Sequence, residues 1–484
     1  MKLNNPELLR SQCLINGEWC DALSGKREAV INPATGVELA SIPLVSEEET
    51  QQAIAAAQRA QNDWKQLTAK QRSALLLAWA DKVLAAQEDL AQLMTAEQGK
   101  SLAEARGEVA YAASFITWFA EEAKRVDGAV LQAPQASQRL VVVKQPIGVC
   151  AAITPWNFPA AMITRKVAPA LAAGCAIIVK PAEQTPLTAL ALAKLAQDAG
   201  IPAGVLQVVT GEAAQVGRVL CDSPVVRKLS FTGSTEVGRI LMAQCAPSIK
   251  KLSLERGGNA PVIVFDDANL DAAVAGIMAS KFRNSGQTCV CANRIYVQDG
   301  IYERLAEKLV AAVEQLKVGD GSQEGTTQGP LIDSDAVAKV QSHIDDALIK
   351  GAQIATGGQP HALGGTFFQP TVVTGVTQKM RFAKEETFGP VAPLFRFHDE
   401  AEAIAMANDT EFGLAAYLFT QNAARQWRVP EALEYGMVGI NTGLISNEVA
   451  PFGGVKQSGL GREGSRYGIE EYLELKYLCI DVSC

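Results

Sequence analysis

The chain has 484 residues, more than one hydrophobic core usually organises, so we expect two or three domains. Its composition, 48% hydrophobic and 20% charged, is typical of a folded globular protein and excludes a disordered one. A formal net charge of -8 without a Lys/Arg-rich run argues against nucleic acid or an anionic membrane as the main partner.

Targeting and metal signals are weak in this sequence. Residues 1–7 lack a basic stretch before an apolar core, which argues against a signal peptide, and the apolar runs are too short to span a bilayer. The ten cysteines lack C-x-x-C spacing, so we expect reduced thiols in a cytoplasmic protein. His343, His361 and His398 form no metal-ligand pattern, and we expect no metal site.

The expected elements change in character along the chain. The first third is helical, with an N-cap at Ser46 before an Ala-rich helix to Ala60 and amphipathic helices over 69–99. The β-branched run 139–147 predicts a strand.

From Val149 short apolar strands alternate with helices. Strands are expected at 149–154, 176–180, 205–210 and 228–232, and helices at 160–173, 185–200 and from Ser234. This alternation predicts parallel βαβ units in a doubly wound, Rossmann-like sheet of the dinucleotide-binding kind. A second series predicts another α/β domain, with strands near 261–265 and 293–297 and helices near 270–284 and 301–316. Residues 472–482 predict a closing strand.

Two segments follow predicted strands, where open α/β sheets bind ligands. Residues 231–238 (FTGSTEVG) place glycines where a strand turns into a helix, so that backbone N–H groups can face a pyrophosphate. The segment is neither G-x-G-x-x-G nor a P-loop, so an ordinary βα turn is the alternative. Lys180 and Glu183 could hold the ribose hydroxyls of an adenosine, or form a solvated loop pair.

A cysteine in a Gly-containing loop is the candidate nucleophile. Cys289 lies in 285–291 (SGQTCVC), which favours a tight loop with an accessible thiol, whereas most cysteines are small core residues. A thiolate needs electropositive surroundings or a nearby base. With no histidine close in sequence, a Cys-His protease is disfavoured, and Glu255 is the candidate base.

Together these segments resemble the aldehyde dehydrogenase superfamily over nearly the whole chain. The resembling segments, in the family's order, are TPWNFP (154–159), KPAEQTP (180–186), FTGSTEVG (231–238), Glu255-x-Gly-Gly-Asn, Gly286-Gln287-x-Cys289, EETFGP (385–390) and PFGG-x-Lys (451–456). One such segment would carry little weight, but this many in order are highly specific.

The resemblance implies a role for each matching residue. Cys289 would attack the aldehyde, and the Asn157 amide with the Cys289 backbone N–H would stabilise the oxyanion, each donor being worth about 3–4 kcal/mol. Hydride transfer would leave a thioester, and Glu255 would activate the water that hydrolyses it. Glu463 would relay protons, or form a surface salt bridge. The implied cofactor-binding residues are Thr154, Pro155, Trp156, Lys180, Glu183, Gly233, Ser234, Gly257, Glu386 and Phe388.

Within the superfamily the chain is most similar to succinate-semialdehyde dehydrogenases, whose substrate carries a distal carboxylate. Arg165, Arg283 and Ser446 occupy the positions of that subfamily's carboxylate ligands, unless both arginines form structural salt bridges. Glutarate semialdehyde would be a secondary substrate, because one CH2 discriminates by only about 1–3 kcal/mol. Similar bacterial members often carry a small residue at Glu183, which admits the 2′-phosphate of NADP. A Glu there repels a phosphate, so we expect NAD to be preferred and NADP to remain usable through Lys180.

Two residues beside the implied machinery carry further expectations. Arg256 replaces a small or aliphatic residue of the family, and this cation would lower the pKa of Glu255, pin it in an ion pair and slow deacylation, or else point to solvent. Cys291 is the redox partner of the nucleophile in some relatives, or a buried spectator; a bridge spanning one residue is strained.

We expect three parts in the chain. Residues 1–124 and 145–255 would form the NAD(P)-binding domain, 256–450 the catalytic domain, and 125–144 with 451–484 an oligomerisation element. Its strand edges predict a homodimer or homotetramer. The alternatives are another semialdehyde or aliphatic aldehyde on the same mechanism and, from a different class, a non-catalytic dinucleotide-binding protein. A CoA-acylating enzyme is disfavoured because Glu255 supplies the base for hydrolysis.

Overall fold

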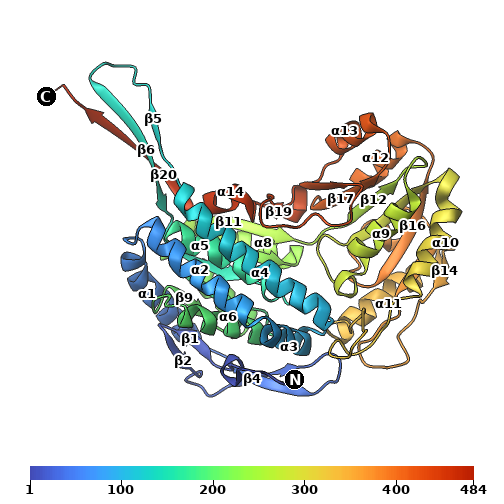
Figure 1. The fold of residues 1–484 in the computed structure, drawn as a ribbon, viewed down its shortest axis with the longest axis horizontal. Coiled ribbons are helices and arrows are strands. Elements are labelled where there is room, and N and C mark those ends of the chain that lie inside the picture. The colour runs from blue at the N-terminus through green and yellow to red at the C-terminus, as the bar shows by residue number, and fades with distance from the viewer. Residues whose placement is uncertain (484) are drawn as a thin grey trace.

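The computed structural model describes residues 1–483. Two α/β units, built on an eight-stranded and a seven-stranded sheet, lie on the two sides of Figure 1, and a three-stranded sheet projects from the first unit. No helix within residues 1–483 has the length and apolar character that crossing a membrane requires.

The eight-stranded sheet has parallel pairing at its centre. Its order is β19 (Gly459–Leu460), β11 (Lys251–Arg256), β10 (Val226–Gly233), β7 (Val149–Ile153), β8 (Ile177–Lys180), β9 (Leu206–Val208), β1 (Cys13–Ile15) and β2 (Glu18–Cys20). From β7 the chain proceeds through β8 and β9 in one direction and through β10 and β11 in the other. The strand order therefore switches between β7 and β10, and open α/β sheets bind ligands at such a switch point.

The helices of this unit make two kinds of contact: some pack on the strands of the sheet, and others pack on those helices. They are α1 (Glu47–Trp64), α2 (Ala69–Ala85), α3 (Gln87–Gln98), α4 (Leu102–Glu122), α5 (Ala161–Ala173), α6 (Pro186–Asp198), α7 (Ala213–Asp222), α8 (Thr235–Cys245) and α14 (Ser465–Glu470). The expected N-cap Ser46 forms a reciprocal capping box with Glu49. Every residue of α5 is buried, and α4 packs against it.

The seven-stranded sheet forms the second unit. Its order is β14 (Gln353–Thr356), β15 (Thr371–Val376), β16 (Val391–Phe397), β13 (Ala292–Gln298), β12 (Ala260–Val264), β17 (Ala415–Phe419) and β18 (Met437–Ile440). The helices of this unit are α9 (Leu270–Lys281), α10 (Tyr302–Val313), α11 (Ser334–Ile349), α12 (Glu400–Asn408) and α13 (Ala423–Ala432). Separate apolar clusters involve the two faces of the sheet, because neighbouring strand residues such as Val262 and Ile263 point in opposite directions.

The projecting sheet is antiparallel and has the order β20 (Leu473–Asp481), β6 (Gln138–Pro146) and β5 (Ala129–Leu131). Figure 1 shows it extending away from the body, with the end of the chain near its tip.

The predicted α/β class, with a doubly wound first sheet, a second α/β unit and a small β element, is confirmed. Of the residues expected in the oligomerisation element, β20 joins the projecting sheet, whereas β19 pairs with β11 and α14 packs on α4 and α5. The expected domain bounds stay a prediction. The helical first third also contains the strands β1, β2, β3 (Arg27–Ile31) and β4 (Glu38–Pro43). These strands are only three to six residues long and show little alternation in burial.

Candidate active site

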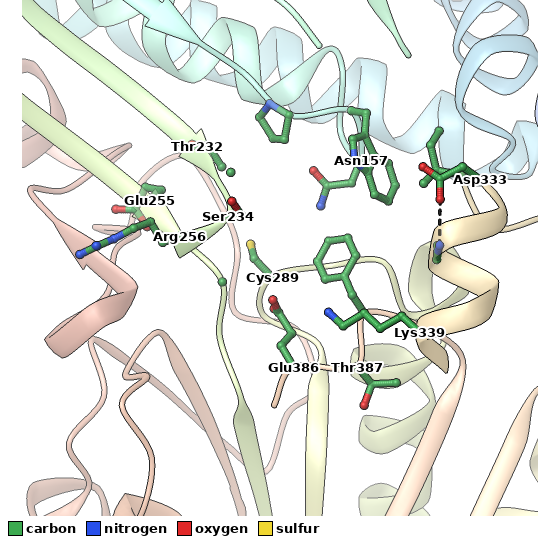
Figure 2. A pocket seen from close by; sticks show the side chains of 17 residues that line it. Asn157, Thr232, Ser234, Glu255, Arg256, Cys289, Asp333, Lys339, Glu386 and Thr387 are labelled. Carbon is green, nitrogen blue, oxygen red and sulfur yellow. Dashed lines mark hydrogen bonds between the residues drawn. The ribbon is translucent and has the colours of Figure 1, made fainter. Parts of the chain in front are cut away.

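A cavity of about 290 Å³ is lined by residues from both α/β units. Figure 2 shows the Asn157 amide and the Cys289 thiol pointing toward the same space, with Glu386 beside the thiol. The first unit contributes the ends of β7, β10 and β11, and the second contributes the loop before β13 and residues 386–388. The structure therefore brings together motifs that are far apart in the sequence.

Cys289 follows a tight turn formed by residues 284–286. Asn284, Ser285 and Gly286 have φ angles of 50°, 53° and 76°, in the left-handed region. A Cβ on Gly286 would lie 2.1 Å from the Gly389 carbonyl oxygen, so this position requires glycine. The expected helix to residue 284 therefore ends earlier, at Lys281, and the turn presents a partly exposed thiol to the cavity.

The Cys289 thiol lies in surroundings that oppose its ionisation. Burial, and then the charge of Glu386, raise the pKa of Cys289 to about 12, while the Arg165 guanidinium acts in the opposite direction. At neutral pH the residue is therefore a thiol, and its activation requires added positive charge or removal of the proton.

Asn157 lies after the end of β7 with its backbone held from both units. Its carbonyl oxygen accepts hydrogen bonds from Lys100 Nζ at 2.8 Å and from Asn284 Nδ2 at 3.0 Å. One Asn157 Nδ2–H bonds to the Gln287 carbonyl at 3.1 Å. Because an amide nitrogen carries two protons, one donor is left for a ligand in the cavity.

Glu255, the penultimate residue of β11, has a buried carboxylate. Within residues 1–483 neither of its oxygens has a hydrogen-bond partner, and the residue is 2% exposed. Burial, followed by the charge of Glu463, raises the pKa of Glu255 well above its ordinary value. A buried carboxylate with a raised pKa is a good proton acceptor once it has ionised.

The expected ion pair between Arg256 and Glu255 is absent from the described residues, and the pKa of Glu255 is raised rather than lowered. This part of the Arg256 prediction is wrong because consecutive strand residues project to opposite faces. The Arg256 side chain passes beneath α8, where a Cβ on Gly238 would lie 2.5 Å from its Cδ. Its buried Nε has no partner in the described chain.

Glu463 is 5% exposed and lies in a buried ionic cluster. It pairs with Lys166, and Arg165 Nη1 lies 3.5 Å from its other oxygen. Lys166 Nζ also donates to Thr232 Oγ1 at 2.6 Å. A surface salt bridge, the alternative considered for Glu463, is therefore excluded. The negative charge of Glu463 helps to raise the pKa of Glu255.

A second cavity, of about 660 Å³, contains two of the three expected carboxylate ligands. Arg283 and Ser446 line it, together with Tyr111 and Phe158. The Arg283 guanidinium lies 4.7 Å from the centre of the Phe158 ring. The lining also includes Lys100, Glu104 and Glu108, so Arg283 lies among charged as well as aromatic side chains.

Arg165 does not line this cavity. It is 2% exposed and lies between the rings of Phe115 and Phe452, at 4.8 and 4.6 Å. Its Nη2 donates a hydrogen bond to Tyr111 Oη at 2.6 Å, and this hydroxyl links Arg165 to the lining of the cavity. Sequence reasoning did not identify Tyr111, because an aromatic residue on an amphipathic helix is usually a packing residue.

The dinucleotide-type features lie at the switch point. Ser234 caps α8 by accepting from the Val237 N–H, leaving the helix N-terminus facing the 290 Å³ cavity beside Gly233. A Cβ on Gly257 would lie 2.5 Å from Glu386 Oε2, so glycine keeps the space beside that carboxylate open. Glu386 accepts from the Gly258 N–H at 3.0 Å, and its burial raises its pKa to about 7.

The remaining expected cofactor residues lie around this cavity or on the same sheet edge. Trp156 and Phe388 form an edge-to-face pair with ring centres 5.6 Å apart, and Pro155 lies beside them in the lining. Thr154 is buried, and its N–H bonds to the carbonyl of Lys180 at the end of β8. Lys180 Nζ pairs with Glu183 at 2.9 Å; neither residue lines the cavity of Cys289. A helix N-terminus, open glycines and polar groups at strand ends fit a dinucleotide.

Cys291 is a buried free thiol. Its Sγ contacts the carbonyl oxygens of Lys281 at 3.3 Å and Ala292 at 3.6 Å, and Cys289 is also free. Burial raises the pKa of Cys291, so little thiolate is present there at neutral pH.

The sequence is similar to known proteins over nearly its whole length. The sequence matches the Aldehyde dehydrogenase family over residues 19–478. It is 65% identical over 480 residues to the succinate-semialdehyde dehydrogenase [NADP(+)] GabD of Escherichia coli (strain K12), covering 99% of this chain and all of that protein. It is 64% identical to a glutarate-semialdehyde dehydrogenase of Pseudomonas putida, with full coverage of both. A crystal structure of an NADP-dependent enzyme from Escherichia coli superposes with a TM-score of 0.99 at 64% identity, covering 99% of this chain and 100% of that one. The chain therefore belongs to the aldehyde dehydrogenase family and is an aldehyde oxidoreductase that binds a nicotinamide dinucleotide.

Proposed function

We propose that this enzyme oxidises succinate semialdehyde to succinate. The observation that carries this proposal is the 660 Å³ cavity, where Arg283 and Ser446 face the space beside Tyr111 and its partner Arg165. A planar guanidinium binds a carboxylate through two charge-assisted hydrogen bonds. The names of the Escherichia coli and Pseudomonas putida relatives support a substrate of this class.

The residues around Cys289 suit a thioester mechanism. The partly exposed Cys289 thiol first loses its proton to solvent, and its sulfur then bonds to the aldehyde carbon. The negative charge on oxygen is stabilised by the free Asn157 Nδ2–H and the Cys289 backbone N–H. A nicotinamide held beside Glu386 and Phe388 would supply the hydride acceptor, and oxidation of the bound carbon would leave a thioester on Cys289. Glu255 then takes a proton from water, which attacks the thioester and releases the acid and the thiolate. We propose Glu463 as the carboxylate that would relay this proton, because its charge acts on the pKa of Glu255.

We infer that NAD is preferred over NADP. The Glu183 carboxylate, paired with Lys180, lies at the carboxyl end of β8, where it would accept hydrogen bonds from ribose hydroxyls and repel a 2′-phosphate. Burial acts to raise the pKa of Glu183, but its pairing with Lys180 lowers the pKa below the ordinary value, so the carboxylate is charged at neutral pH. The Escherichia coli relative is named for NADP, and the preference therefore rests on Glu183.

For the parts of the molecule, we propose that the eight-stranded sheet binds the dinucleotide and that the second unit carries catalysis. The projecting sheet would bind further copies of the chain in a homodimer or homotetramer. Its exposed apolar side chains include Val130, Leu475, Tyr477 and Ile480. Replacing Leu475 and Tyr477 by Glu should reduce the mass measured by light scattering; an unchanged mass would refute this interface.

Steady-state formation of the reduced nicotinamide tests the substrate and the cofactor together. Succinate semialdehyde, glutarate semialdehyde and butanal would each be measured with NAD and with NADP. A strong preference for both acid semialdehydes over butanal is expected, because only they carry a carboxylate. Equal kcat/KM for butanal would remove the substrate assignment, and glutarate semialdehyde as the better substrate would favour the longer acid.

A further inference from the structure

Residues at the start of helix α4 contact the segments that carry Asn157 and Cys289, the two proposed donors to the oxyanion. Lys100, immediately before this helix, is 2% exposed. Its Nζ donates to Glu108 Oε2 at 2.5 Å and to the Asn157 carbonyl oxygen at 2.8 Å, and lies 4.0 Å from the centre of the Phe158 ring. A fully buried ammonium is costly unless it is paired and hydrogen-bonded, and here both conditions are met.

Glu108 extends this contact to the start of α5. Its Oε1 accepts hydrogen bonds from the N–H groups of Ala160 at 2.9 Å and Ala161 at 3.2 Å. A carboxylate at a helix N-terminus is stabilised by unpaired N–H groups and by the helix dipole. The chain from Asn157 to Ala161 is thus held at both ends by one ion pair from α4.

Glu104 contacts the segment that leads to Cys289. It lies one helical turn before Glu108 and therefore on the same side of α4. Its Oε1 accepts from the Asn284 N–H at 2.7 Å, and Asn284 Nδ2 donates to the Asn157 carbonyl at 3.0 Å. Asn284 begins the left-handed turn that leads to Cys289, so Glu104 stabilises a strained backbone just before the nucleophile.

We propose that Lys100, Glu104 and Glu108 are positioning residues that set the Asn157 amide and the Cys289 backbone N–H at the separation needed to bind one oxyanion. The inference rests on the function proposed above for Asn157 and Cys289. None of the three carboxylate or ammonium groups has to contact the reacting atoms; they act through Asn157 and through the turn at Asn284. A displacement of about 1 Å in such donors can reduce the rate about 100-fold.

The test separates reactions that form an oxyanion from one that does not. Acylation of Cys289 by p-nitrophenyl acetate passes through an oxyanion, whereas alkylation by iodoacetamide requires an accessible thiolate but forms no oxyanion. The double variant Lys100→Met/Glu108→Gln avoids leaving a lone buried charge, and Glu104→Ala perturbs a partly exposed residue. Both should lower acylation and kcat about 10- to 100-fold while alkylation changes less than about threefold.

Two further variants make the result decisive. Asn157→Ala is the reference: if it does not lower acylation, the proposed role of Asn157 fails irrespective of α4. Glu121→Ala, at the far end of α4, is the matched control and should leave both rates unchanged. Combining Glu104→Ala with Asn157→Ala should add little to the loss from Asn157→Ala alone, because the two act on one interaction. If Asn157→Ala slows acylation but the α4 variants do not, or if they slow alkylation equally, the positioning role is overturned.

Discussion

Arg165 Nη2 donates a hydrogen bond at 2.6 Å to the hydroxyl of Tyr111, and Tyr111 lines the 660 Å³ cavity. Arg165 itself is enclosed by aromatic rings and lies near the Glu463 carboxylate. A substrate carboxylate in this cavity would meet Arg283 directly, and would meet the charge of Arg165 only through Tyr111.

Removing that hydroxyl should weaken recognition of acid semialdehydes selectively. Tyr111→Phe keeps the ring but leaves Arg165 Nη2 without its acceptor. A hydrogen bond involving a charged group is worth about 1.5–3 kcal/mol, so kcat/KM for succinate semialdehyde should fall at least about tenfold. Butanal, which has no carboxylate, should be affected less than about threefold. Tyr467→Phe, at an exposed tyrosine, is the control, and equal losses on both aldehydes would contradict the role of Tyr111.

The charge on Glu386 should control the reactivity of Cys289. Glu386, after burial, is the main group that raises the pKa of Cys289 to about 12, and Glu386 itself has a pKa of about 7. Above about pH 7 Glu386 is ionised and suppresses the thiolate; below it the carboxyl is neutral and has no such effect. Glu386→Gln should therefore accelerate iodoacetamide alkylation of the cofactor-free enzyme above pH 7, with the difference vanishing at lower pH.

The control for this experiment is the neighbouring Glu385→Gln. Glu385 pairs with Arg381 and His343 rather than with the thiol, so its replacement should leave alkylation unchanged. If Glu386→Gln gives the same rate as the unchanged enzyme at every pH, the charge of Glu386 does not act on Cys289.

Short motifs allowed the principal site to be predicted from the sequence, because each stands at the end of a strand or in a fixed turn. Asn157 follows β7 and Glu255 lies near the end of β11 in the first sheet, whereas Cys289 follows the left-handed turn before β13 of the second. The packing of the two units therefore brings these residues to one cavity. Tyr111 and Lys100 were not predicted, because each acts through a contact with a residue more than fifty positions away in the sequence. Arg165 was expected as a ligand of the substrate carboxylate, yet its burial depends on rings from α4 and from the loop at Phe452. The pairing of β19 could not be predicted for a similar reason: this strand is two residues long and exists only through its contact with β11.

Replacing Glu183 should shift cofactor preference. Glu183→Ser removes the carboxylate that would repel a 2′-phosphate and frees Lys180, its partner at 2.9 Å, to pair with that phosphate. The ratio of kcat/KM for NAD to that for NADP should fall by at least about tenfold, as expected from the loss of like-charge repulsion and the gain of one cationic contact. Lys180→Met should lower use of NADP by the Ser variant. An unchanged ratio would show that neither residue faces the adenosine ribose.

Arg256 should have little effect on hydrolysis of the thioester. Its side chain passes beneath α8, and Glu255 forms no hydrogen bond with it. Arg256→Leu should therefore leave the deacylation rate, measured in single turnovers after rapid acylation, within about twofold. A clear acceleration would indicate that the cation does reach Glu255 during the reaction and weakens it as a base.

Cys291 should not govern inactivation by peroxide. Its thiol contacts two carbonyl groups within the second unit, and burial raises its pKa, so it offers little thiolate for exchange with an oxidised Cys289. A bridge spanning one residue would also require the loop to leave its present geometry. Cys291→Ala should accordingly lose activity in peroxide at the same rate as the unchanged enzyme and recover equally with dithiothreitol. Recovery lost in the variant, together with faster irreversible inactivation, would instead show that Cys291 captures the oxidised nucleophile and protects it from overoxidation.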